Sequence, residues 1–144
     1  PIVNMLHETV RHAAARHGPG AIVGLLATDG TIASRVYHDA ATATGLALIT
    51  PDATHQALVM DAIYGERGVK AGCTTGACRD ALLAAIGHLA GRGATVAILG
   101  CTELPLIVPG SEAFGVGEHT LAILDPTDLL ARACVAHARG ESRG

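Results

Sequence analysis

The sequence predicts an α/β fold, a parallel sheet of about four strands flanked by helices. Four short apolar runs lack the polar–apolar alternation of half-exposed strands, which indicates strands buried on both faces: 21–28, 46–50, 95–100 and 121–125. Helical patterns separate these runs, which favours right-handed crossovers between parallel strands. Hydrophobic residues make up 49% of the 144-residue chain, enough to fill the core of one domain.

Five helices are expected from apolar stripes and from their end signals. Gly18 and Gly45 are natural stops for the first two. The last helix begins at Asp125-Pro126-Thr127, with aspartate as N-cap and proline at the first helical position. The five expected ranges are about 4–17, 31–44, 52–65, 76–91 and from 125 onward.

Two further expectations concern the C-terminal third of the chain. Residues 108–119 (VPGSEAFGVGEH) are rich in glycine and proline and are predicted to form a loop. The apolar stripe of the last helix is expected to be buried through Leu129, Leu130, Ala133 and Cys134.

Charge and composition exclude several classes of protein. The formal net charge is −3 and no basic run occurs, which argues against binding to nucleic acid or to an anionic membrane surface. No apolar run approaches the ~20 residues that span a bilayer. No signal peptide is recognised, so a cytoplasmic protein with reduced thiols is expected.

Motifs for metals and cofactors are also missing from the sequence. The four cysteines form no C-x-x-C pair, the eight histidines are scattered, and no His-plus-carboxylate cluster is recognised, so no metal is expected. No glycine-rich nucleotide signature is present, and no cofactor is predicted.

The segment ATDGT (27–31) leads from the first strand into a helix. Thr28 and Thr31 offer hydroxyls, and Gly30 would let a ligand approach the backbone closely. A helix start here would suit a small carboxylate. The simpler interpretation is that Thr28 or Asp29 only caps the helix.

The segment GCTE (100–103) repeats this arrangement after the third strand. Ligands of parallel sheets bind outside the carboxyl ends of the strands, where Cys101 falls. Backbone N–H groups in the following turn would favour a thiolate and lower the pKa of Cys101, making it more reactive than Cys134. Alternatively, Cys101 is a buried structural cysteine.

Lys70, the only lysine, lies in GVKAG (68–72) and could bind an acidic group as a point charge or lie solvated at the surface. Cys73 and Cys78 are expected in a loop and in a helix. His7 is expected at the surface rather than in a cleft.

Together ATDGTI, GVKAG and GCTELP closely resemble, in order and spacing, the aspartate/glutamate racemase family of cofactor-independent amino-acid racemases. Members of that family have two α/β lobes, each of which supplies one cysteine to the cleft between them. The resemblance covers nearly the whole chain but only the second, C-terminal lobe, and implies a Rossmann- or flavodoxin-like fold. It divides the chain into a helix from the first lobe (1–18), the second lobe (19–115), and a closing strand and helix (116–144).

The resemblance also implies roles for individual residues. Cys101 would be the second-lobe catalytic thiol, and Thr102 with its backbone N–H would bind the substrate carboxylate. Thr28 and Thr31 would line the same site, and Lys70 would recognise the carboxylate of the substrate's side chain. Gly30 and Glu103 would support them.

The first-lobe cysteine motif (CNT) of the family is not found in this sequence. Because racemisation needs an acid and a base on opposite faces of the α-carbon, this lobe alone is expected to be inactive. Either a first lobe or second subunit completes an enzyme, with a homodimer expected, or the chain is a non-catalytic binding or assembly module. A related hydantoin racemase or maleate isomerase is a further alternative, since the substrate is expected to be a small amino acid or dicarboxylate.

Overall fold

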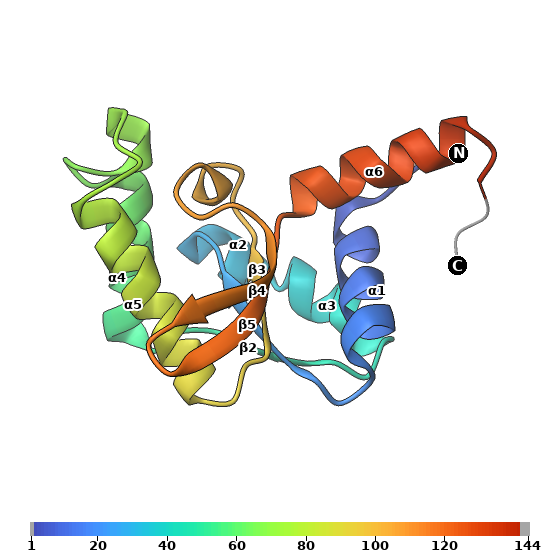
Figure 1. Ribbon diagram of the computed structural model, residues 1–144, viewed down its shortest axis with the longest axis horizontal. Helices are drawn as coiled ribbons and strands as arrows, with labels where there is room; N and C mark the ends of the chain where they lie inside the picture. The colour runs from blue at the N-terminus through green and yellow to red at the C-terminus, as the bar shows by residue number, and fades with distance from the viewer. Residues whose placement is uncertain (1, 142–144) are drawn as a thin grey trace.

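The computed structural model describes residues 2–141 and confirms the α/β fold (Figure 1). A five-stranded sheet has the order β2-β1-β3-β5-β4. Its first four strands in that order run parallel, and β4 lies antiparallel at one edge. The strands are β1 Ile22–Leu26, β2 Ala47–Ile49, β3 Val96–Leu99, β4 Ser111–Val116 and β5 His119–Leu124.

The expected capping residues set the ends of several helices. Asn4 caps the first helix, Asp52 the fourth, and Asp125 the last, each accepting backbone N–H groups with its side chain. None of the helices within residues 2–141 is long and apolar enough to cross a membrane. The helices are α1 Met5–His17, α2 Asp29–Ser34, α3 Val36–Thr42, α4 Ala53–Tyr64, α5 Ala77–Gly91, α6 Pro126–Ala138 and the short 3-10 turns η1 Val69–Ala71 and η2 Leu104–Leu106.

Helices cover both faces of the sheet, as strands apolar on both faces require (Figure 1). Successive β1 residues alternate between the two layers: Leu25 packs toward α1 and α3, whereas Leu26 packs toward α4 and α5. Two apolar clusters therefore fill the core, one on each side of the sheet.

The loop expected over 108–119 is wrong in its centre. Residues 111–116 form β4, which turns at Gly117 and pairs with β5 as a hairpin. This strand was not recognised because it lies at the sheet edge and its residues are half-buried or exposed, so it needs no apolar run. The division expected between residues 115 and 116 falls at the end of β4, and both sides of it belong to one sheet.

The single helix expected over 31–44 is two helices. Thr28 starts α2 earlier by capping it, and Arg35 ends α2 in a left-handed conformation with φ of 59°. The chain then re-enters a helix and buries Tyr37 against the sheet. A left-handed arginine has no sequence signature, so the break was not predicted.

The burial expected for the last helix is also wrong. Leu129, Leu130 and Ala133 are only half-buried, and Cys134 is exposed. The helix packs against α1 and extends beyond the sheet, so no second layer covers its stripe (Figure 1).

Candidate active site

The carboxyl ends of β1 and β3 lie side by side because the two strands pair in parallel. The N–H of Gly100 donates to the carbonyl of Leu26 at 2.7 Å, which continues the pairing one residue past β3. A Cβ at Gly100 would lie 2.9 Å from Leu25 Cδ1 and 3.2 Å from Ala27 Cβ. Glycine therefore allows this close approach, and Cys101 follows it at the strand end nearest to Thr28.

Cys101 is half-buried in the turn after β3, and its thiol donates to Glu103 Oε2 at 2.8 Å. Burial and the hydrogen bond to the Glu103 carboxylate raise the pKa of the Cys101 thiol. The backbone N–H groups of Glu103 and Leu104 act in the opposite direction but do not compensate. The lowered pKa predicted from the sequence is therefore wrong, and Cys101 is a neutral thiol at neutral pH.

Glu103 is the centre of this group of side chains. Its Oε1 accepts from Lys70 Nζ at 2.7 Å, and its Oε2 accepts from Thr102 Oγ1 at 3.0 Å as well as from the Cys101 thiol. These three hydrogen bonds lower the pKa of Glu103 to about 2. We call Lys70, Cys101, Thr102 and Glu103 the Glu103 network.

Lys70 reaches this network from η1, 33 residues before Glu103. Its pKa is raised by the Glu103 carboxylate, and Nζ also lies 5.5 Å from the ring centroid of Tyr64. The lysine side chain remains 46% exposed. Lys70 thus lies beside the turn that carries Cys101, with its charge paired to Glu103 and still accessible to solvent.

Thr28 and Thr31 form a half-buried hydroxyl pair at the end of β1. Thr28 Oγ1 accepts the N–H of Thr31 at 3.2 Å, which caps α2, and lies 3.1 Å from Thr31 Oγ1. The capping role considered from the sequence is therefore realised. Gly30 is exposed, and a Cβ there would meet no atom within 4 Å.

Tyr37 lies close to this site and was not identified from the sequence. Its ring carbon Cε2 would be 3.2 Å from a Cβ at Gly100, directly before Cys101. Within residues 2–141 its buried hydroxyl has no hydrogen-bond partner. Burial, with the charges of Asp125 and Cys101, raises the pKa of Tyr37 to about 12. A tyrosine in an apolar stripe carries no signal of such a position.

The other cysteines lie apart from the Glu103 network, and all four thiols are free. Cys73 lies in a loop and Cys78 within α5, as predicted. The thiol of Cys78 donates to backbone carbonyls, which fits a structural role. His7 is exposed, also as predicted.

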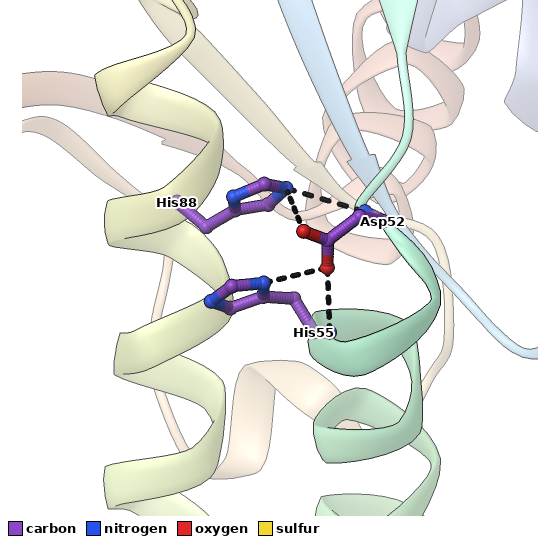
Figure 2. A group of neighbouring side chains, drawn as sticks. All are labelled: Asp52, His55 and His88. Atoms are coloured by element: carbon purple, nitrogen blue, oxygen red, sulfur yellow. Dashed lines mark hydrogen bonds and ion pairs between the residues drawn. The ribbon is translucent and has the colours of Figure 1, made fainter.

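A second group of polar side chains lies where α4 begins, beside α5 (Figure 2). Asp52, His55 and His88 bring one carboxylate and two imidazoles together, with ligand atoms all within 4.8 Å of one another. The sequence analysis missed this His-plus-carboxylate cluster, because His88 is 36 residues from Asp52. The only local signal was the D-x-x-H spacing at the start of a predicted helix.

Several known proteins resemble this chain. A protein of Pectobacterium carotovorum subsp. carotovorum, described only as an uncharacterized protein in the pnlA 3′ region, is 40% identical over 113 residues. The match covers 74% of this chain and 65% of that protein. The chain therefore spans less than two thirds of the length of this relative.

Solved structures with the same fold include racemases. A putative Asp/Glu racemase from Yersinia pestis superposes with a TM-score of 0.79 and is 26% identical, covering 96% of this chain and 56% of that one. An aspartate racemase homologue from Pyrococcus horikoshii OT3 has a TM-score of 0.76 at 21% identity, covering 96% and 57% of the two chains. An aspartate racemase from Picrophilus torridus has a TM-score of 0.68 at 24% identity, covering 99% and 54%. The last two likenesses show the fold alone.

The sequence profile of the Asp/Glu/hydantoin racemase family matches residues 1–134, nearly the whole chain. The α/β fold matches slightly more than half of each racemase structure. The chain therefore belongs to the Asp/Glu/hydantoin racemase family.

Proposed function

We propose that this chain supplies the second lobe of a cofactor-independent amino-acid racemase, with Cys101 as the proton-transferring group on one face of the substrate. One observation carries the proposal: a half-buried thiol follows β3 and donates to a carboxylate at 2.8 Å, next to the strand end that holds a hydroxyl pair. Family membership supports the same assignment.

The protonation state of Cys101 defines its part in the reaction. Because burial and Glu103 keep the thiol neutral, Cys101 begins as the acid that delivers a proton to the α-carbon. Glu103, with a pKa of about 2, is too weak a base to take that proton. A base from the first lobe would remove the α-proton from the opposite face, and Cys101 would become a thiolate as it protonates the carbanion.

The polar groups around Cys101 would bind the two carboxylates of aspartate or glutamate. The hydroxyls of Thr28 and Thr31, with the backbone N–H of Thr102, would bind the α-carboxylate and stabilise the charge that develops there. Lys70 is exposed enough to share its charge between Glu103 and the side-chain carboxylate of the substrate. The lysine would also offset the negative charge of a Cys101 thiolate.

The uncovered side of α6 supports a partner for this lobe. Val135 is 49% exposed, and Leu129 and Leu130 are half-buried. A cavity of about 490 Å³ lies between residues of α1, α6 and the β4–β5 hairpin. We place a first lobe, or a second subunit of a homodimer, against α6, where it would cover this apolar surface.

The test is α-proton chemistry with D- and L-aspartate and D- and L-glutamate in D₂O, followed by NMR and chiral chromatography. The longer open reading frame, where the gene encodes one, is expected to interconvert the enantiomers, and Cys101→Ser is expected to abolish interconversion in at least one direction. Cys134→Ser is the matched control and should leave it intact, since this exposed thiol lies on α6. Racemisation unchanged by Cys101→Ser would contradict the proposal, as would a bound dicarboxylate without proton exchange in the complete protein.

A further inference from the structure

The group formed by Asp52, His55 and His88 lies outside the Glu103 network and has no part in the proposed racemase chemistry. Asp52 and His55 come from the first turn of α4, and His88 comes from the last turn of α5. Asp52 Oδ1 lies 2.6 Å from His55 Nδ1, and Asp52 Oδ2 lies 3.8 Å from His88 Nε2. One carboxylate therefore faces a nitrogen of each imidazole (Figure 2).

The two imidazoles are held in an unusual arrangement. Their rings stack with centroids 3.9 Å apart and an interplanar angle of 1°. Both ring nitrogens that face Asp52 point to the same side of the stack (Figure 2). The His55 and His88 side chains are only 29% and 15% exposed, so packing of α4 against α5 restricts their rotation.

The hydrogen bonds show that one of these nitrogens carries a free lone pair. The backbone N–H of Asp52 donates to His88 Nε2 at 3.2 Å, so this nitrogen is unprotonated and available as a ligand. His55 Nδ1 lies at hydrogen-bond distance from the Asp52 carboxylate and would bind a cation after its proton moves to Nε2 through solvent. Asp52 is half-exposed, which leaves solvent access to the group.

We propose that Asp52, His55 and His88 bind a divalent transition-metal ion of the Zn²⁺ class. Two imidazoles and one carboxylate are a common protein donor set for such ions, with water completing the coordination. The set does not suit Mg²⁺ or Ca²⁺, which prefer oxygen ligands. No sulfur ligand belongs to the group.

The geometry requires a small rearrangement rather than a new fold. Ligands of a tetrahedral zinc ion at about 2.0–2.1 Å lie roughly 3.4 Å from one another, whereas these atoms now spread to within 4.8 Å. Parallel rings also direct their lone pairs along parallel lines, so rotation of each ring about its Cβ–Cγ bond is needed to converge on one ion. The bound ion would tie the start of α4 to the end of α5.

A metal-titration experiment on the untagged 144-residue chain, with its thiols reduced, tests this site. Zn²⁺ is expected to bind with one-to-one stoichiometry by calorimetry and to raise the thermal midpoint, whereas Mg²⁺ should do neither. Because loss of a metal site's outer partners already weakens binding by about 10- to 100-fold, His55→Gln, His88→Gln and Asp52→Asn should each weaken Zn²⁺ binding at least that much. Asn at position 52 keeps a good helix N-cap, so this variant separates metal binding from folding.

Two controls keep the result specific. His137→Gln removes an exposed histidine of α6 and should leave Zn²⁺ affinity unchanged. Co²⁺ bound in place of Zn²⁺ should show visible d–d bands without a thiolate-to-cobalt charge-transfer band, since none of the ligands is cysteine. In the unmodified chain, Zn²⁺ should shift the ring NMR signals of His55 and His88 selectively, which tests the site even if a variant fails to fold.

Three outcomes would overturn the proposal: no saturable Zn²⁺ binding below millimolar concentrations, a thiolate charge-transfer band, or affinity unchanged in all three ligand variants. Each of these results would assign the group to helix capping and packing alone. None of them depends on racemase activity, so the metal site and the proposed function can fail independently.

Discussion

At the scale of single residues, Glu103 determines the state of the candidate catalytic thiol. It accepts the Cys101 proton at 2.8 Å and raises the pKa of that thiol, while Lys70 and the neighbouring donors hold the pKa of Glu103 at about 2. The proton therefore stays on sulfur. A motif that reads as an activated thiolate in the sequence is, in this lobe, a protonated thiol beside a fixed anion.

Alkylation should reveal this state directly. In the 144-residue chain at neutral pH, iodoacetamide is expected to label exposed Cys134 several-fold faster than Cys101, because only the thiolate reacts and Cys101 is both half-buried and protonated. The Cys101 rate should rise with pH as the thiol ionises. Peptide mass spectrometry measures both rates, and faster labelling of Cys101 would contradict the raised pKa.

The variant Glu103→Gln tests the cause. Removing the carboxylate removes the hydrogen bond and the charge that raise the pKa, so Cys101 should be labelled faster. Glu112→Gln is the control, since that exposed carboxylate pairs with Arg16 and not with a thiol. Equal Cys101 rates in the chain and in Glu103→Gln would rule out this account.

At the scale of elements, apolar runs predicted the four parallel strands correctly because each is buried between helix layers. The polar edge strand β4 and the left-handed break at Arg35 carry no such pattern, and both were missed. The stripe of α6 was recognised, but a stripe does not reveal what covers it. The expectation that it was buried was therefore wrong.

The site was predictable to the same extent. Thr28 and Cys101 were placed together because each follows a strand, and strand ends meet at one edge of a parallel sheet. The Lys70–Glu103 pair joins residues 33 positions apart, and only the path of α4, η1 and α5 brings them together. A local pattern contains no information about such pairings.

Substituting Gly100 tests the junction between β1 and β3. Gly100→Ala would push a methyl group against Leu25, Ala27 and Tyr37 at 2.9–3.2 Å, and is expected to destabilise the chain by about 1–3 kcal/mol. Gly91→Ala is the matched control, because a Cβ there meets nothing within 4 Å at the end of α5. Urea denaturation should show no loss for Gly91→Ala, and equal stability of Gly100→Ala would contradict the crowding.

At the scale of the whole molecule, the two layers around the sheet differ in completeness. The α4–α5 layer buries one side fully, with six residues of α5 inaccessible to solvent. On the other side α1 and α3 cover the sheet, while α6 contributes only Pro126 to the buried residues. The molecule is therefore least stabilised along α6, where the partner lobe is proposed.

Hydrogen exchange should show this difference. The backbone amides of α6 are expected to exchange faster than those of α5, because few apolar contacts oppose local opening of α6. Exchange followed by mass spectrometry on peptides from both helices measures the contrast. If a first lobe or second subunit binds as proposed, α6 should gain protection while α5 changes little; equal protection of the two helices in the chain alone would contradict the prediction.

The edges of the sheet limit how this chain can associate with others. At one edge β2 offers only three residues, and at the other β4 is interrupted by an irregular register between Ser111 and Phe114 and carries the charged Glu112. Short, bulged or charged edge strands resist the addition of a strand from another chain. Assembly is therefore directed away from cross-β stacking and toward contacts between helices, which protects a partly uncovered lobe from aggregating through its sheet.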